Sequence, residues 1–509
     1  MASDAVPSNL VSSVIGYQLA TGNFQNSTSN LPQRIAIFGE ANTDNQSSID
    51  FGVGVEVVSA QKAGELFGFG SPIHQAMRIL RPFSGSGVGG IPTVIYPQEE
   101  AGGATAKEIE LSVTGTATAN VTHTAIVAGR RGIDGVSYDF TVNTGDDAGA
   151  IHAKIEDAIN NVLGCPVEAV STDYEVTLTT KWKGLTADEI TVTIDTNGND
   201  AGLNYSTSDI QSGAGTPNDL VDSLALIGNE WATIGINCYG VNESICSTFE
   251  AWNGIPDPVN PTGRYSSIMM KPMIVLNGYT GTDFDGAIAT FTATRTNEVT
   301  LSICATPNSL GTTTEAAANF AYLYANQAQD RPHLDIQGSN LPDMPTPTDI
   351  GDMAIYTTRD YVVKKGCSTV ELVAGNYRVV DFVTTYRPLG ENPPQFRYVR
   401  SLTQDFNMRY AYYILEQREV VNKAIAKDNA PVSVAGVIRP SQWKQILFTM
   451  AKDLEARAII TDAKFMTDSI VVNIGTSNPD RFETTFKYKR SGFSRILSTT
   501  GEAGFNFNN

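Results

Sequence analysis

The feature that most constrains the fold of this 509-residue chain is an alternation of predicted strands and helices that is interrupted once. A buried strand at residues 31–39 is followed by two short capped helices and a strand at 91–96, and the alternation resumes at Thr216-Pro217. Strands that alternate with helices form a mostly parallel sheet with helices on both faces. The sequence therefore predicts an α/β layer that is built from two separate parts of the chain.

The interruption spans residues 101–212 and lies between two Gly/Ala-rich joints. It holds several short strands of antiparallel character and one helix at residues 148–163, in which isoleucines recur every four residues on one face. We expect this segment to form an inserted β-rich domain with its own core, packed lightly on the α/β layer through flexible connections.

The pattern changes again after the Pro-rich run at residues 341–347. Two short strands, two long helices at residues 402–425 and 442–459, and a hairpin around Asn478-Pro479-Asp480 predict an α+β domain. The expected protein is therefore a multidomain α/β and α+β chain. Its predicted parts are an N-terminal arm at residues 1–24, an α/β middle domain at 25–100 and 213–362, the inserted β-rich domain at 101–212, an α+β domain at 363–492, and a C-terminal arm at 493–509.

Both chain ends resemble isolated β-strands. Apolar side chains are spaced among Gly, Ser and Thr at residues 11–24 and again at 493–507. A lone strand has unpaired backbone groups and is marginal in water, so it must join a sheet of its own chain or of a neighbour. Both possibilities remain open from the pattern alone. If the ends link subunits, the candidate linking residues are Val14, Ile15, Gly16, Tyr17, Phe493, Ile496, Leu497, Phe505 and Phe507.

Composition excludes several classes of function. The formal net charge of −19 argues against direct binding of nucleic acid, which requires clustered Lys and Arg. No apolar run approaches the length of a membrane-spanning helix, and the first twenty residues lack the features of a secretory signal, so we expect no membrane insertion and a cytosolic place of synthesis. The five scattered cysteines are expected to be buried, reduced thiols.

The motifs of catalysis and metal binding are incomplete. The run Gly85-Ser86-Gly87-Val88-Gly89-Gly90 has the letters of a dinucleotide fingerprint, but it follows a helix and precedes a strand, which is the wrong order. The acidic turn at residues 195–200 lacks the Gly and the Glu of a calcium loop. The four histidines are far apart, and His74 and His152 are expected to be satisfied surface or boundary residues on helices. We therefore expect no catalytic residue, metal or cofactor.

Several stretches, taken in order, resemble one protein family. They are Val6-Pro7-Ser8-Asn9, residues 31–39, Leu66-Phe67-Gly68-Phe69-Gly70-Ser71, residues 114–119, Gly129-Arg130-Arg131, residues 177–184, residues 224–231, Thr384-Thr385-Tyr386, and residues 468–482. Together they are similar to the contractile tail sheath proteins of Mu-like bacteriophages. One element departs from the family, because Ile15-Gly16-Tyr17-Gln18 stands where relatives commonly carry Pro-Gly-x-Tyr-x-Glu.

The resemblance implies a non-enzymatic subunit of a virion tail, assembled in the host bacterial cytoplasm. The subunit would polymerise helically around a tail tube and contract to drive the tube through the bacterial envelope during DNA ejection. Its implied partners are further copies of itself, the tail tube protein, and the baseplate and tail terminator proteins. It also implies that the inserted domain lies outermost and that residues 363–492 face the tube.

The helix at residues 442–459 has two candidate roles. Its apolar stripe is more typical of core packing than of partner binding, and its polar side carries Lys444, Lys452 and Arg457 as possible tube-facing residues, although solvated charges are the simpler interpretation.

Three alternative functions are also consistent with the sequence. The chain could be the sheath of a headless contractile injection system or bacteriocin, or a non-contractile virion or baseplate component, or an α/β enzyme.

Overall fold

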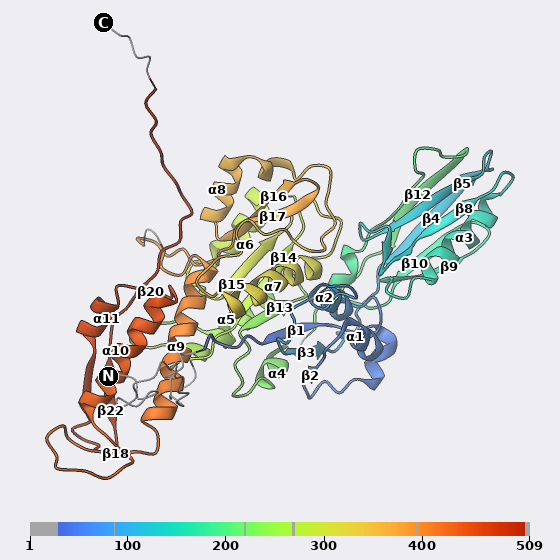
Figure 1. Cartoon of the computed structure of the whole chain (residues 1–509). Coiled ribbons are helices and arrows are strands. Elements are labelled where there is room, and N and C mark those ends of the chain that lie inside the picture. The colour runs from blue at the N-terminus through green and yellow to red at the C-terminus, as the bar shows by residue number, and fades with distance from the viewer. Residues whose placement is uncertain are drawn as a thin grey trace, which may run out of the picture. The chain divides into compact units, whose positions relative to one another are not determined.

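The computed structural model describes residues 29–85, 87–217, 220–266, 270–282, 284–391 and 394–503, except for the side chains of residues 284, 285 and 352. The described chain forms two compact units (Figure 1). One contains residues 30–409 and the chain end from Arg490, and the other contains residues 410–489. The N-terminal arm, with Val14, Ile15, Gly16 and Tyr17, lies outside the described residues, as do Phe505 and Phe507.

The first unit is organised around an eight-stranded sheet with the strand order β17-β16-β15-β14-β13-β1-β3-β2. Its six central strands run parallel, and the two edge strands pair antiparallel to their neighbours. The strands are β1 (Ile35–Glu40), β2 (Val55–Glu56), β3 (Thr93–Gln98), β13 (Ile234–Asn237), β14 (Ile274–Tyr279), β15 (Leu301–Ala305), β16 (Cys367–Val373) and β17 (Asn376–Asp381). The mostly parallel sheet that the alternation predicts is confirmed.

Helices cover both faces of this sheet, as β1 shows. Consecutive residues of a strand point to opposite faces. Phe38 packs edge-on against Phe249 of α5, whereas a side-chain atom at Gly39 would meet Ile73 of α2. The helices of the unit are α1 (Ala60–Phe67), α2 (Pro72–Leu80), α4 (Leu220–Ala225), α5 (Glu243–Asn253), α6 (Ala289–Ala293), α7 (Thr313–Asp330) and α8 (Tyr356–Lys364). Serines cap α1 and α2 as the sequence predicts, since Ser59 accepts from the Lys62 amide and Ser71 accepts from the His74 amide.

The sheet continues beyond the border that we expected at residue 362. Strand β16 pairs with β15 through Ile303 and Cys367, so β16 and β17 extend the α/β layer and do not belong to a separate C-terminal domain. The Pro-rich run is part of a loop that lies along β17, where the Leu341 amide donates to the Tyr377 carbonyl. The sequence changes character at this run because the run lies along β17, the edge strand of the sheet.

The inserted segment forms its own group of strands (Figure 1). A four-stranded sheet of order β12-β4-β10-β9 and a three-stranded sheet of order β11-β5-β8 share one buried cluster of side chains with the helix α3. Its elements are β4 (Glu108–Gly115), β5 (Val121–Val127), β6 (Gly132–Ile133), β7 (Val136–Ser137), β8 (Asp139–Val142), α3 (Ala148–Asn160), β9 (Val167–Ser171), β10 (Val176–Thr180), β11 (Val192–Asp195) and β12 (Leu203–Gln211). All members of the cluster lie between Ile109 and Leu203, so the segment has a core of its own.

The two joints of the inserted segment are paired with each other. The Thr105 amide donates to the Ala214 carbonyl, and the Ala214 amide donates back to Thr105. The chain therefore leaves and re-enters the α/β layer at two residues that lie side by side. This ordered connection differs from the flexible joints that the Gly content predicts.

Buried side chains correct one prediction and confirm another. His74 and His152 are 2% and 0% exposed, so they are core residues and not surface or boundary residues. Each is satisfied, because the Gly70 amide donates to His74 and the Val113 amide donates to His152. Burial lowers the pKa of His74 to about 4, which keeps this ring neutral. The five cysteines are all free and buried, as predicted.

Among the described residues, no cluster of His, Cys, Asp and Glu could hold a metal ion, and no helix is long and apolar enough to cross a membrane.

The second unit is mainly helical. The long helix α9 (Val399–Glu419) crosses the division between the units, and α10 (Pro440–Ala456) and α11 (Ala463–Ser469) follow it. Its strands are β18 (Ala424–Ile425), β19 (Val437–Ile438), β20 (Ile460–Thr461), β21 (Val471–Ile474) and β22 (Phe482–Thr485), and β23 (Lys489–Arg490) lies at its end. The two long helices and the hairpin are present near their predicted positions.

Candidate assembly surfaces

The C-terminal segment is anchored to the first unit over its first six residues. Arg490 binds the carboxylate of Asp405 through two nitrogens, at 2.7 and 2.6 Å. Arg400 donates to the carbonyl and the hydroxyl of Ser491, at 2.9 and 3.0 Å. The guanidinium of Arg400 also lies over the ring of Phe493, 5.2 Å from its centroid. These contacts hold the chain against the end of the α/β layer.

The anchor ends at Arg495, which binds two carboxylates. One guanidinium nitrogen lies 2.6 Å from Asp335, and a second donates to Asp381 on β17. The side chains of Arg495 and Asp335 are only 10% and 1% exposed. Burial raises the pKa of Asp335, and the nearby Arg495 opposes this shift. A buried carboxylate of this kind requires its cation, so the position of Arg495 is strongly determined.

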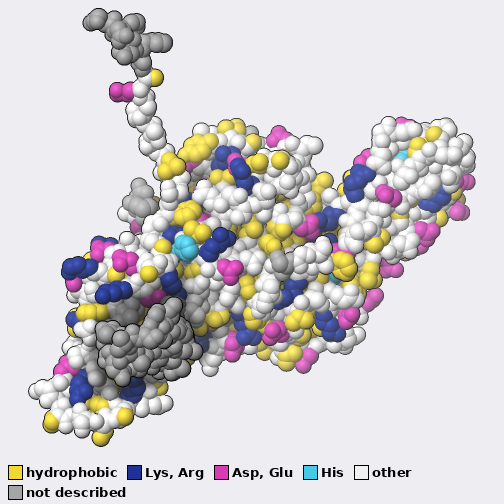
Figure 2. Space-filling model, viewed as in Figure 1, with side chains coloured by type: hydrophobic (Ala, Val, Ile, Leu, Met, Phe, Trp, Pro, Cys, Tyr) yellow, Lys and Arg dark blue, Asp and Glu magenta, His cyan; other side chains and the backbone are white. Residues whose placement is uncertain are grey.

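The side chains of the C-terminal segment become exposed directly after Arg495. Ile496 and Leu497 are 90% and 83% exposed, and the described residues from 496 to 503 form neither helix nor strand. Figure 1 shows them as an extended thread, and Figure 2 shows the same residues standing away from the surface. Exposure of two large apolar side chains to water is unfavourable, and an extended backbone has unpaired groups that can bond to another strand. Of the predicted linking residues described here, Phe493 belongs to the anchor, whereas Ile496 and Leu497 belong to the free part.

The hairpin β21–β22 in the second unit is a candidate acceptor surface. Its two strands pair antiparallel, and no third described strand joins them. One face of the hairpin packs on helices. Trp443 on α10 donates to the Thr484 hydroxyl, and the ring centroid of Tyr412 on α9 lies 5.6 Å from that of Phe486, which directly follows β22. Val471 is 49% exposed. A two-stranded sheet of this kind is marginal alone and has edges at which further strands can add.

The helix α10 uses its apolar stripe for the core. Trp443, Leu447 and Leu454 are buried, which confirms core packing as the main role of this stripe.

The three charged residues proposed on the other side of α10 do not form one surface. Arg457 lies roughly 140° around the helix from Lys452 and pairs with Asp453. Lys444 lies roughly 80° from Lys452 and sits over the ring of Phe448, while Lys452 is exposed. Only Lys444 and Lys452 point in similar directions, so a contact with a partner would rest on these two.

Sequence reasoning missed the residues that fix the chain end. Asp335, Asp381, Arg400 and Asp405 come from distant parts of the sequence, and no local pattern marks them. The one available signal was the pair of arginines, Arg490 and Arg495, in an otherwise uncharged stretch of the tail.

An anchored chain end that continues into an exposed apolar extension, together with a hairpin that no third described strand joins, is typical of a structural subunit. The sequence is 24% identical over 437 residues to the Mu-like prophage FluMu tail sheath protein of Haemophilus influenzae, and the match covers 84% of this chain and 85% of that protein. This chain is therefore a homologue of a tail sheath protein, which is a structural and not an enzymatic class of protein. The family resemblance seen in the sequence motifs is therefore confirmed.

Comparison with solved structures gives matches of lower sequence identity. A sheath tail protein of Desulfitobacterium hafniense has a TM-score of 0.45 at 10% identity, with 93% of this chain and 100% of that chain covered. A sheath tail protein of Listeria innocua has a TM-score of 0.43 at 11% identity, with 92% and 94% covered. A chain of the anti-feeding prophage baseplate has a TM-score of 0.46 at 11% identity, with 97% and 100% covered. No protein-family model matches the sequence.

Proposed function

We propose that this chain is the subunit of a contractile phage tail sheath. In this role it polymerises helically around a tail tube in the host cytoplasm, becomes part of the virion tail, and contracts to drive the tube through the bacterial envelope during DNA ejection. The observation that carries the proposal is the exposed extension after Arg495 in a member of the tail sheath family. Its partners would be further copies of this chain, the tube protein, and the baseplate and terminator proteins.

A helical polymer requires a head-to-tail contact that does not close into a ring. A chain end that leaves one subunit and adds to a sheet of the next provides such a contact. The anchor at Arg495 fixes where the extension starts, while the described residues beyond it, 496–503, are all exposed. Subunits linked in this way can rotate as rigid bodies during contraction without losing their connection. The open hairpin β21–β22 is the acceptor that we favour.

Electron microscopy of the purified chain tests the proposal. We expect negative-stain images to show long tubes at high protein concentration, with the diameter of a sheath. Only monomers or small closed rings would contradict a sheath and favour a non-contractile virion component. The alternative of a headless contractile system predicts the same tubes, and the presence or absence of capsid genes beside the sheath gene separates the two.

The two lysines of α10 give a second prediction. If Lys444 and Lys452 face an acidic tube surface, the double variant Lys444→Glu/Lys452→Glu should fold normally and co-sediment with preformed tubes at least tenfold less well, because attraction becomes repulsion. Lys427→Glu/Lys62→Glu is the control, since it makes the same change of charge at two exposed lysines outside α10. Equal co-sedimentation of both variants would place the tube contact elsewhere.

We further propose that the inserted domain lies on the outside of the sheath and that residues 363–492 face the tube, as the family resemblance implies.

A further inference from the structure

The inserted domain meets the α/β layer through several polar contacts, which include the ion pair of Arg78 with Asp134, the bond from the Thr43 amide to the Lys181 carbonyl, and the contacts of Arg130. Arg130 lies in the loop after β5, where Ala128 and Gly129 both have positive φ angles of 47° and 71°. A Cβ atom at Gly129 would lie 2.7 Å from Leu310 and 2.9 Å from Pro345. The loop tip is thus pressed against the α/β layer so closely that only glycine fits.

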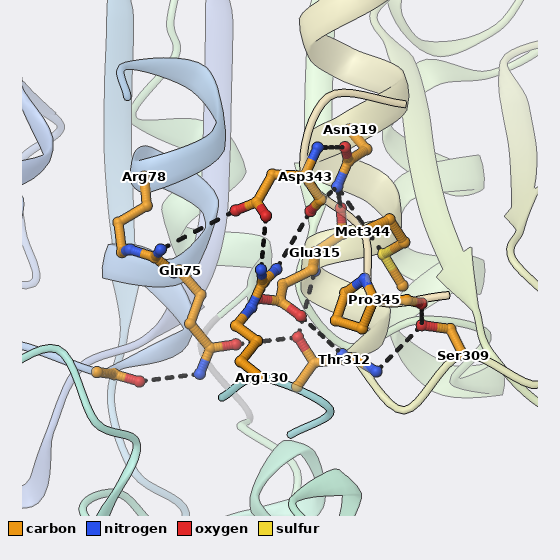
Figure 3. A network of polar contacts seen from close by, with 12 residues as sticks. Gln75, Arg78, Arg130, Ser309, Thr312, Glu315, Asn319, Asp343, Met344 and Pro345 are labelled. Atoms are coloured by element: carbon orange, nitrogen blue, oxygen red, sulfur yellow. Dashed lines mark hydrogen bonds and ion pairs between the residues drawn. The ribbon is translucent and has the colours of Figure 1, made fainter. Parts of the chain in front are cut away.

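The Arg130 guanidinium bridges two carboxylates of the α/β layer (Figure 3). Its Nε and Nη2 atoms lie 3.1 and 2.8 Å from Glu315, and its Nη1 lies 2.5 Å from Asp343. The side chains of Arg130 and Glu315 are 12% and 3% exposed. The pair is therefore buried at the interface.

Glu315 also belongs to the N-terminal cap of α7. Its second oxygen accepts from the Thr312 amide at 3.1 Å, and the Thr312 hydroxyl donates to Gln75 on α2 (Figure 3). Asn319, one turn further along α7, holds the backbone of Asp343 from both sides. Arg130 thus binds a rigid, preformed anionic site at the start of the central helix.

A second contact reaches the same helix end. The carboxylate of Glu189, in the short 3₁₀ helix Leu185–Glu189 of the inserted domain, accepts from the amide and the hydroxyl of Thr313, both at 2.7 Å. Thr186 of the same turn donates to Glu40 at the end of β1. Hydrogen bonds and ion pairs thus cross this interface beside the close contact of Gly129 with Leu310 and Pro345, whereas the apolar core of the inserted domain lies within its own residues. Interfaces of this kind typically join domains that can move apart.

We propose that Arg130 is a latch: while it is bound at the start of α7 it holds the inserted domain in one orientation, and when it is released the domain swings on its paired joints at Thr105 and Ala214 with both parts still folded. The inserted domain is then a docked module and not a fixed part of the body. This inference does not depend on which contractile system uses the chain.

The acidic groups around Glu189 give the latch a pH dependence. The pKa of Glu189 is raised to about 7, mainly by burial and also by Glu315 on α7 and Asp188 on its own turn, while the bonds from Thr313 oppose the shift. The neutral thiol of Cys238 also faces it, and Lys107 binds the Asp188 carbonyl. A carboxyl whose pKa is raised on docking takes up a proton there, so docking is strongest below its free pKa near 4.5 and weakens as the pH rises through about 7.

Distance measurement between two spin labels tests the latch in the full-length chain. Because the five native cysteines are buried and unreactive, labels can be attached at Tyr174→Cys on the inserted domain and Leu226→Cys on the α/β layer, both of which are exposed. We expect one narrow distance distribution in this background. Arg130→Gln/Glu315→Gln, which removes both charges and leaves no buried ion unpaired, should broaden it. Arg131→Gln is the matched control, since Arg131 pairs within the inserted domain with Asp195.

Hydrogen exchange on the same variants checks that both parts stay folded. In the double variant we expect the amides of Thr312 and Thr313 to exchange at least tenfold faster, with β4, β10, β1 and β14 unchanged. An unaltered distance distribution would overturn the latch, and so would loss of protection throughout the inserted domain, because that would make the interface part of one cooperative core.

The pH arm of the experiment uses Glu189→Gln. In the chain with native Glu189, the open fraction should rise by roughly one to two orders of magnitude between pH 5 and pH 8, at about tenfold for each unit of pKa shift. Glu189→Gln should remove this dependence. The same dependence in both proteins would exclude Glu189 as the pH-sensitive part of the latch.

Discussion

A chain cut after Arg495 is expected to fold and melt like the full-length protein and to form no tubes. The cut removes Ile496, Leu497 and the rest of the exposed extension but keeps every contact of the anchor. The exposed residues make no described secondary structure within their own unit, so their loss should cost little folding free energy. They would stabilise the polymer through backbone hydrogen bonds and apolar burial that form only on association.

Circular dichroism, thermal melting and negative-stain images of the cut chain provide the measurement. Ile496→Ser/Leu497→Ser in the full-length chain is the matched variant, and it should weaken polymerisation without shortening the chain. Hydrogen exchange adds a direct check, since residues 496–503 should be protected in the polymer and unprotected in the monomer. Tubes formed by the cut chain, or protection already present in the monomer, would remove strand donation by this end from the mechanism.

The position of the cut matters because the anchor stabilises the first unit. A cut after Ser491 would also remove Phe493 and Arg495, and it would leave Asp335 without its cation. Such a chain should melt at a lower temperature, so a failure to assemble could not be assigned to the arm. Cutting after Arg495 separates the two effects.

Replacing Arg495 with alanine is expected to destabilise the first unit by about 3–5 kcal/mol, which is the usual effect of breaking a buried ion pair by removing one partner. Asp335 is 1% exposed and would remain buried without its ion-pair partner, keeping only backbone hydrogen bonds and the more distant Arg400. Urea unfolding of the monomer measures the loss. Lys62→Ala is the control, because it breaks the exposed pair with Glu65 and should cost no more than about 1 kcal/mol.

Neutralising the carboxylate should reverse most of the effect. Arg495→Ala/Asp335→Asn is expected to regain more than half of the lost free energy, because an amide is much less costly to bury than a carboxylate. The loss in Arg495→Ala should also shrink as the pH falls, because protonation of the buried Asp335 removes the unpaired charge. A loss that stays the same in the double variant would mean that Arg495 acts through packing and not through its charge.

Local sequence patterns were sufficient to predict most of the strands and helices of the α/β layer. The buried strand runs and the serine caps of α1 and α2 were sufficient to place the parallel sheet and its helices. Helix α8 was missed because its sequence, rich in Thr, Tyr and Val, has weak helical propensity and depends on packing against β16.

Long-range pairing was not accessible from the sequence. Asp335 and Arg495 are 160 positions apart, and Arg130 and Glu315 are 185 apart. Each of these residues is typical of a solvated surface when it is considered alone. The same limit hid the groups that dock the inserted domain, Thr186, Glu189 and Arg130, because these residues are polar. Burial of His74 and His152 was missed for the same reason.

The pairing of Thr105 with Ala214 would allow another domain to replace the inserted domain in the course of evolution. The α/β body presents two neighbouring chain ends, and any foreign module whose own termini lie close together could be spliced there without disturbing the strands beneath. In the proposed sheath, the module carried at this point could then vary in size and shape while the polymer-forming parts of the chain stay the same. This position is the natural place to graft an antigen, a fluorescent reporter or an affinity handle onto the particle.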